Sequence, residues 1–212
     1  MPLILKFKPE EQAQVAVWKI TEAPEALLIQ LRELGVYADI PFFRNQGRLA
    51  EWLTARLLLA EMGVSQRITY DKAGKPHLEG AAHRPISLSH SGNHVAAITH
   101  HHTNVGIDIE LTGERILRVM HKFVGPAETQ WLSDEPEQRL IQLYQIWGAK
   151  ECAFKIRGGG GIGFIEELEV DNPGSESSQA TRVTLTKDGK SWTYRVFFQY
   201  LDKMLLTYGF ET

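Results

Sequence analysis

The sequence predicts an α+β protein made of two similar halves, residues 1–105 and 106–212, each with a small antiparallel sheet and packed helices. Its length of 212 residues is enough for two small domains with their own cores. Hydrophobic residues make up 43% and charged residues 23% of the chain, as in ordinary globular proteins. Patterns typical of helices are followed by patterns typical of strands, and this order occurs twice along the chain.

The first half is expected to begin with a strand at residues 12–19 and a helix at residues 24–34, which Gly35 ends. Its strongest helix covers residues 46–62, because leucine and tryptophan side chains recur there at helical spacing before Gly63. The other expected elements are a loop at residues 70–76 and strands at 86–91, 94–100 and 104–110, the last two forming a hairpin across the polar residues 101–104.

The second half is expected to contain a long helix at residues 136–157, whose apolar face includes Trp147. The four glycines at residues 158–161 follow as its stop and lack the lysine ending of a phosphate-binding loop. The other expected elements are helices at residues 114–124 and 126–133 and strands at 181–186, 191–200 and 204–208, joined as two hairpins.

Composition excludes several classes of protein. With 23 Lys and Arg against 26 Asp and Glu, the net charge of −3 argues against a general nucleic-acid binder, which needs a basic excess. The single cysteine, Cys152, permits neither an intrachain disulfide nor a four-cysteine zinc site, so we expect a cytoplasmic protein. We also expect no signal peptide and no membrane segment, since no apolar run is long enough.

Two carboxylates stand two residues apart in the apolar strand at residues 104–110. Because strand side chains alternate, Asp108 and Glu110 must point to the same face. Hard oxygen ligands of this kind suit Mg²⁺. The pair alone fits a polar outer face at least as well as a metal site.

Glu151 and Lys155 stand four residues apart in the long helix and therefore lie side by side, with Trp147 one turn before them. A surface ion pair is the ordinary explanation of such a spacing. The aromatic residues of this face argue that it points inward or into a cleft, where a charge needs a metal or a phosphate as its partner.

A histidine lies among small hydroxyl residues in the segment Ser87-Leu88-Ser89-His90-Ser91. This composition is found in hydrolase triads, but the chain has no Gly-x-Ser-x-Gly turn to carry a nucleophile. Small polar groups beside a histidine can equally hold a phosphate. In the helix at 46–62, Arg48 and Arg56 lie near one face, either as a solvated stripe or as binding groups.

Taken together, these motifs resemble those of the 4′-phosphopantetheinyl transferases, in particular the two-domain type that activates peptide synthetases. The resemblance rests on segments that occur in the family's order over about residues 44–165: Gly74-Lys75-Pro76, Ser89-His90-Ser91, Gly106-Ile107-Asp108-Ile109-Glu110 and Trp147-Gly148-Ala149-Lys150-Glu151-Cys152-Ala153-Phe154-Lys155. The hallmarks G-[IV]-D-x-E and W-x-x-K-E-x-x-x-K make this a specific signal. The resemblance implies two halves in a pseudo-twofold arrangement with the active site at their interface.

The resemblance also implies a reaction, in which the phosphopantetheine arm of coenzyme A moves to a serine of an apo carrier protein and adenosine 3′,5′-bisphosphate leaves. The implied catalytic residues are Glu151, as the base, with Lys155 and His90. The implied metal ligands for Mg²⁺, with Mn²⁺ possible, are Asp108, Glu110 and Glu151. The implied coenzyme A contacts are Arg48, Lys75, Pro76, Ser89, His90 and Lys155. Lys150 would be a second cation beside the site and Glu128 an acidic residue near the metal.

The carrier protein is the implied macromolecular partner, and the two-domain form implies a monomer. If residues 114–124 are helical, Arg115, Arg118 and Lys122 form one basic stripe, suited to an acidic carrier. An ordinary solvated helix face explains the same pattern. Two other functions remain open at this point: a binding module for coenzyme A or carrier without chemistry, and a metal-dependent nucleotide phosphohydrolase.

Overall fold

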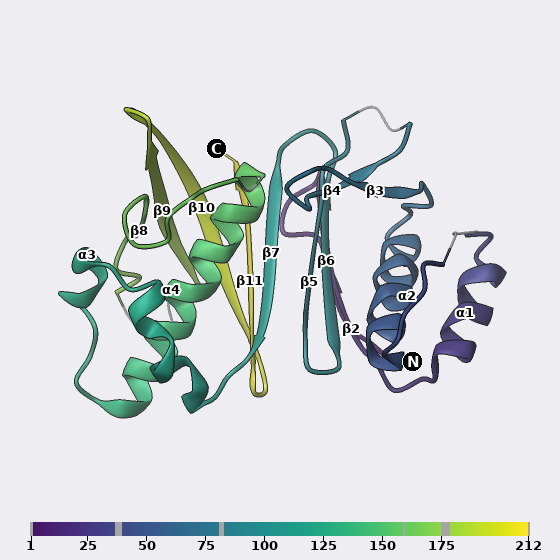
Figure 1. Ribbon diagram of the computed structural model, residues 1–212, viewed down its shortest axis with the longest axis horizontal. Helices are drawn as coiled ribbons and strands as arrows, with labels where there is room; N and C mark the ends of the chain where they lie inside the picture. Colours follow the sequence, from purple (N-terminus) through teal and green to yellow (C-terminus); the bar gives the residue numbers. More distant parts are fainter. Residues whose placement is uncertain (1, 37–39, 81–82, 159, 175–178, 212) are drawn as a thin grey trace. The chain divides into compact units, whose positions relative to one another are not determined.

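The computed structural model describes residues 2–36, 40–80, 83–158, 160–174 and 179–211. The chain divides into two compact units, Met1–Thr103 and Asn104–Thr212, each containing antiparallel sheet and helices (Figure 1). The predicted α+β class is confirmed. No helix in the described ranges is both long enough and apolar enough to cross a membrane.

The N-terminal unit has a four-stranded antiparallel sheet in the order β1-β2-β6-β5, with both of its helices on one side (Figure 1). Helix α2 starts where the side chain of Asn45 accepts a hydrogen bond from the backbone N–H of Arg48 at 3.2 Å, and leucines of α2 pack on β2 and β6. The elements are β1 (Leu3–Phe7), β2 (Ala13–Lys19), α1 (Pro24–Glu33), α2 (Gln46–Glu61), the ribbon β3 (Ile68–Tyr70) and β4 (Pro76–Leu78), β5 (Ile86–Ser91) and β6 (His94–His100).

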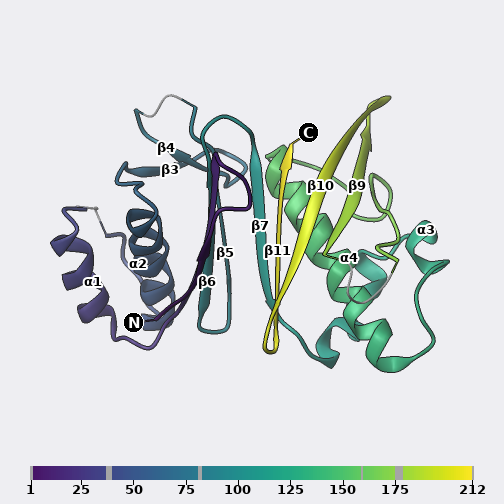
Figure 2. The same ribbon diagram turned by 180° about the vertical axis from the view of Figure 1, so that it is seen from behind.

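The C-terminal unit has a five-stranded antiparallel sheet in the order β7-β11-β10-β9-β8. The long helix α4 crosses in front of this sheet in Figure 1 and behind it in Figure 2, and it contacts β7, β10 and β11. The elements are β7 (Val105–Leu111), the 3₁₀ helices η1 (Glu114–Arg118) and η2 (Met120–Lys122), α3 (Pro126–Thr129), α4 (Pro136–Arg157), β8 (Leu168–Val170), β9 (Ala180–Lys187), β10 (Lys190–Leu201) and β11 (Met204–Glu211).

The predicted hairpin across residues 101–104 is wrong. The strand before it, β6, pairs with β2 and β5, whereas the strand after it, β7, pairs with β11. The two strands thus belong to different sheets, and the polar segment lies where one unit ends and the next begins.

The predicted helix over residues 114–124 is also wrong. Two short 3₁₀ helices take its place, closed by hydrogen bonds over three residues such as Val119 N–H to the Ile116 carbonyl at 3.1 Å. The predicted helix at 126–133 is shortened to α3. The ribbon β3–β4 and the strands β1 and β8 were not predicted. Helix α4 has the predicted bounds and ends at Gly158 in a left-handed conformation, φ 94°, while Gly159 lies outside the described residues.

Candidate functional site

The carboxylates of β7 point toward α4. Lys155 on α4 donates to Asp108 Oδ1 at 2.8 Å, and Trp147 Nε1 of the same helix donates to Glu110 Oε1 at 3.2 Å. The residues between and beside them, Ile107 and Ile109, are buried. The strand alternation inferred from the sequence is therefore present, and it brings both carboxylates of β7 to the helix that carries Glu151.

Two glycines allow α4 to lie close enough to the sheet for these contacts. A Cβ atom at Gly106 of β7 would collide with the backbone carbonyl of Cys152, and one at Gly148 of α4 would collide with Thr207 Oγ1 on β11. Both glycines stand inside the motifs recognised in the sequence, but their role in the close approach of helix and sheet was not predicted from it.

Lys155 is the cation of this cluster. Its Nζ donates to Asp108 Oδ1 and to the carbonyl oxygen of Ile107, both at 2.8 Å, and the Asp108 side chain is only 7% exposed. A carboxylate so far from water needs a positive partner, and the ammonium group supplies it. Glu151 and Lys155, four residues apart, are therefore part of a half-buried cluster and not an exposed ion pair along the helix.

Glu151 lies in the same electrostatic environment. The pKa of its carboxyl is raised to about 7, mainly by burial; Lys155 opposes this rise, and the charges of Asp108 and Glu110 add to it. A carboxyl group with a pKa near neutrality exists in both its protonated and its ionised form at physiological pH. Such a group can accept a proton and release it again.

Glu110 is held at both of its oxygens. Trp147 donates to Oε1, and the guanidinium of Arg115 lies 2.6 Å from Oε2. Arg115 was predicted as a carrier-docking residue of a helical stripe. In the structure it is the ion-pair partner of a predicted metal ligand, and its side chain is exposed, as are those of Arg118 on η1 and Lys122 on η2.

The donor set of this cluster suits a divalent metal ion in its chemistry. Three carboxylates offer hard oxygen ligands, which Mg²⁺ and Mn²⁺ prefer. Within the part of the chain that the structure describes, however, no group of three or more His, Cys, Asp or Glu side chains is gathered for a metal ion. Asp108 and Glu110 are instead paired with Lys155 and Arg115, so the metal ligands predicted from the resemblance stay a prediction.

Lys150 and Glu128 do not belong to this cluster. Their side chains are 0% and 1% exposed, and Lys150 Nζ lies 2.7 Å from Glu128 Oε1. Lys150 also donates to the carbonyls of Phe123 and Phe164, and Glu128 accepts the backbone N–H of Gly125. The expectation of a second cation beside the site and of an acidic residue near the metal is therefore corrected: this is a buried structural pair.

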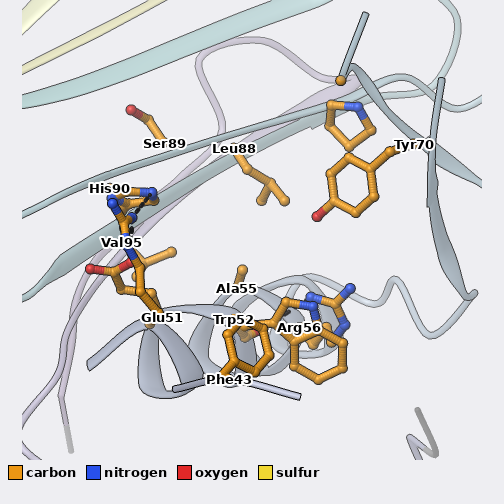
Figure 3. A pocket seen from close by; sticks show the side chains of 13 residues that line it. Phe43, Glu51, Trp52, Ala55, Arg56, Tyr70, Leu88, Ser89, His90 and Val95 are labelled. Carbon is orange, nitrogen blue, oxygen red and sulfur yellow. Dashed lines mark hydrogen bonds and ion pairs between the residues drawn. The ribbon is translucent and has the colours of Figure 1, made fainter. Parts of the chain in front are cut away.

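The N-terminal unit contains a pocket of about 320 Å³ between α2, β5 and the β3–β4 ribbon (Figure 3). Of the residues predicted to bind coenzyme A, four line it: Arg48, Pro76, Ser89 and His90. Lys75 is not among the lining residues, although its neighbours Gly74 and Pro76 are.

One end of the pocket carries Arg48, Glu51 and His90. Arg48 donates to His90 Nε2 at 3.1 Å and to Glu51 Oε2 at 2.9 Å. His90 Nδ1 lies 3.8 Å from Glu51 Oε2, so the three side chains form one cluster. Arg48 brings a positive charge to this end of the pocket, and the predicted role of His90 as a positive group stays a prediction.

The other end of the pocket is aromatic. Figure 3 shows Phe43, Trp52 and Arg56 together there, with the Arg56 guanidinium 3.3 Å from the centre of the Trp52 ring. Arg56 is only 8% exposed, and burial lowers its pKa, so it is not part of a solvated stripe. Sequence reasoning used Trp52 only as one of the residues that predict helix α2. The signal it missed is that Arg48, Trp52 and Arg56 recur every four residues on one face of α2.

Residues 104–208 match the model of the 4′-phosphopantetheinyl transferase superfamily. Over this stretch, 105 of its 212 residues, the chain is similar to that superfamily. The matched residues include the whole cluster of Asp108, Glu110, Glu151 and Lys155. The first of the two superfamily hallmarks thus lies on β7, and the second lies on α4.

Individual relatives carry the same description. The chain is 32% identical over 118 residues to the 4′-phosphopantetheinyl transferase AcpT of Salmonella typhimurium, and the match covers 53% of this chain and 60% of that protein. It is 26% identical over 172 residues to AcpT of Escherichia coli K12, covering 68% of this chain and 83% of that protein. The matched stretch is thus less than two thirds of the length of the Salmonella relative.

Proposed function

We propose that this chain transfers the 4′-phosphopantetheine arm of coenzyme A to a serine of an apo carrier protein and releases adenosine 3′,5′-bisphosphate. The observation that supports this most strongly is the cluster on β7 and α4, where Lys155 donates to Asp108 and where the charges of Asp108, Glu110 and Lys155 act on Glu151, all within the matched residues. Phosphoryl transfer of this type requires little covalent chemistry from the protein and much positioning and neutralisation of charge.

The residues of the C-terminal unit take the reacting end of coenzyme A in this proposal. Lys155 neutralises charge on the pyrophosphate, and Glu151 accepts the proton of the carrier serine. Asp108, Glu110 and Glu151 would hold Mg²⁺, or Mn²⁺ in its place. When bound, such an ion supplies charge neutralisation at the phosphate oxygens.

The pocket of the N-terminal unit binds the nucleotide end of coenzyme A in this proposal. Arg48, His90, Ser89 and Lys75 supply donors for phosphate oxygens, and Pro76 lines the wall. Its aromatic end suits a nucleobase, because base rings stack on aromatic and guanidinium planes.

The carrier protein is received by the segment of η1 and η2. Arg118 and Lys122 are exposed there, beside the exposed apolar side chains of Leu117 and Val119. A basic surface with apolar side chains complements an acidic carrier. Arg115 joins this surface to the cluster through its ion pair with Glu110. The enzyme acts in this proposal as a cytoplasmic monomer.

The test is to incubate the purified chain with coenzyme A, Mg²⁺ and an apo carrier protein and to measure the mass of the carrier. A gain of one phosphopantetheine group is the expected result. Loss of coenzyme A without a gain on the carrier would identify a phosphohydrolase instead. Binding of coenzyme A or carrier with neither change would identify a module without chemistry.

A further inference from the structure

The turn between β3 and β4 is organised by the carboxylate of Asp71. Its Oδ1 accepts the backbone N–H groups of Ala73 at 2.8 Å and of Lys75 at 2.9 Å. The backbone N–H of Asp71 donates to the Lys75 carbonyl at 3.1 Å, and the N–H of Gly74 donates to the Asp71 carbonyl at 3.0 Å. Hydrogen bonds to Asp71 therefore fix the backbone on both sides of the Lys75 side chain.

The second oxygen of the same carboxylate faces His77. Asp71 Oδ2 lies 3.1 Å from His77 Nε2, on the strand that leaves the turn. This contact is the largest of the causes that lower the pKa of Asp71. Asp71 therefore remains an ionised acceptor at neutral pH and connects both arms of the ribbon.

The turn is also part of the wall of the pocket. Gly74 and Pro76, on either side of Lys75, line it. Gly74 has φ +84°, a left-handed conformation that defines the path of the chain into Lys75. If the carboxylate of Asp71 is removed, the turn loses the acceptor that holds this path, and Lys75 loses its fixed position.

We propose that Asp71 is a positioning residue of the coenzyme A site, which acts by holding the turn that presents Lys75 and which makes no contact with the ligand. This inference rests on the proposed function. The carboxylate of Asp71 thus favours the binding of coenzyme A, a polyanion, although its negative charge alone would oppose it.

Asp71 could affect coenzyme A binding through its charge or through the position of Lys75, and the two effects have opposite signs. A carboxylate near an anion site repels the anion, so if only its charge mattered, removing Asp71 would strengthen binding. Removing a residue that positions Lys75 would weaken binding. The expected loss of affinity is about tenfold, which is about 1.4 kcal/mol.

The experiment measures the affinity of the purified full chain for coenzyme A by calorimetry. Asp71→Ala is expected to bind about tenfold more weakly than wild type. Asp71→Asn is expected to stay within about twofold, because its amide oxygen can accept the same two N–H groups. Glu79→Ala removes an equal charge at the exposed end of the same ribbon and is expected to bind no more weakly than wild type.

A double variant tests whether the effect passes through Lys75. In the Lys75→Ala background, Asp71→Ala is expected to add less than about twofold, since the side chain that the turn positions is already gone. In steady-state transfer, Asp71→Ala is expected to raise the KM for coenzyme A and to leave kcat unchanged. A general loosening of the ribbon would instead reduce affinity equally in both backgrounds.

The inference is overturned if Asp71→Ala binds coenzyme A as tightly as wild type or more tightly, or if its effect persists in the Lys75→Ala background. Either result leaves the proposed function intact, because wild type still binds and transfers. If wild type itself does not bind coenzyme A, the proposed function fails, and the role of Asp71 fails with it.

Discussion

Lys155 and Asp108 form the contact that joins α4 to β7 at the candidate site, with Lys155 Nζ 2.8 Å from Asp108 Oδ1. The same ammonium group also donates to the carbonyl of Ile107, one residue before Asp108. The contact is possible because glycines at positions 106 and 148 let the helix lie against the strands. The cluster therefore depends on the packing of the helix on the sheet as well as on its charged residues.

Asp108→Ala is expected to lower the rate of transfer by more than about 100-fold, because Asp108 is proposed as a direct metal ligand. Residues that only hold a metal ligand in place already cost about 10–100-fold in activity when they are replaced. The fold should persist, since Lys155 keeps the Ile107 carbonyl and its side chain is 23% exposed. The measurements are carrier modification and thermal unfolding. Asp171→Ala is the matched control, because it removes an exposed carboxylate paired with Arg182 in the same unit. Near-normal transfer by Asp108→Ala would contradict the role given to the cluster.

Lys150→Met is expected to destabilise the fold by about 3–5 kcal/mol, because it leaves Glu128 buried without its cation. Chemical denaturation measures this change. Lys187→Met, which removes the partly exposed partner of Glu167, should cost no more than about 1 kcal/mol. A Lys150→Met protein that unfolds like wild type but has lost transfer would return Lys150 to the active site.

Gly148→Ala is expected to destabilise the protein by about 1–3 kcal/mol and to reduce transfer, because the added methyl group collides with Thr207 Oγ1 and moves α4 away from the sheet. Thr207→Ala in the same chain should restore part of both losses. Gly113→Ala is the control, since a Cβ there meets no atom of the described residues within 4 Å. Equal behaviour of Gly148→Ala and Gly113→Ala would show that the close packing does not matter.

Arg118→Glu combined with Lys122→Glu is expected to raise the KM for an acidic carrier severalfold and to make it less dependent on salt. The KM for coenzyme A should not change. Arg115 is left intact, because its replacement would also remove the partner of Glu110. Lys190→Glu with Lys203→Glu makes the same change of charge at two other exposed positions, the first residue of β10 and the turn before β11. If both double variants have the same carrier KM at low salt, the docking surface lies elsewhere.

The sequence predicted the elements that carry the cluster because their signals are local. Helix α4 has apolar residues at helical spacing and a glycine stop. In the sequence of β7, apolar residues alternate with the carboxylates Asp108 and Glu110. By contrast, β3, β4 and β8 span three residues each, so they are defined by their pairing partners and carry almost no periodicity of their own. The hairpin at residues 101–104 was predicted wrongly for the same reason, since pairing partners distant in sequence decided the sheets.

The docking segment shows a second limit of sequence patterns. A spacing of three residues, as between Arg115 and Arg118, fits a turn of 3₁₀ helix as well as a turn of α-helix. The burial of Ile116 and Phe123 fixes the path of this segment, and that burial depends on α4. Likewise, Lys150 and Glu151 are neighbours in sequence, but one helical step of about 100° directs Lys150 into the core and Glu151 toward the cluster.

The most direct test of the account is to measure, in one reaction, the adenosine 3′,5′-bisphosphate released and the carrier protein modified. For wild type we expect one nucleotide for each phosphopantetheine group gained by the carrier, and no release without the carrier. Glu151→Gln should lower the kcat of both together by about 10²–10⁴-fold, because the base is lost. Release of nucleotide without modification of the carrier would contradict the proposal that this cluster transfers the arm of coenzyme A to a protein.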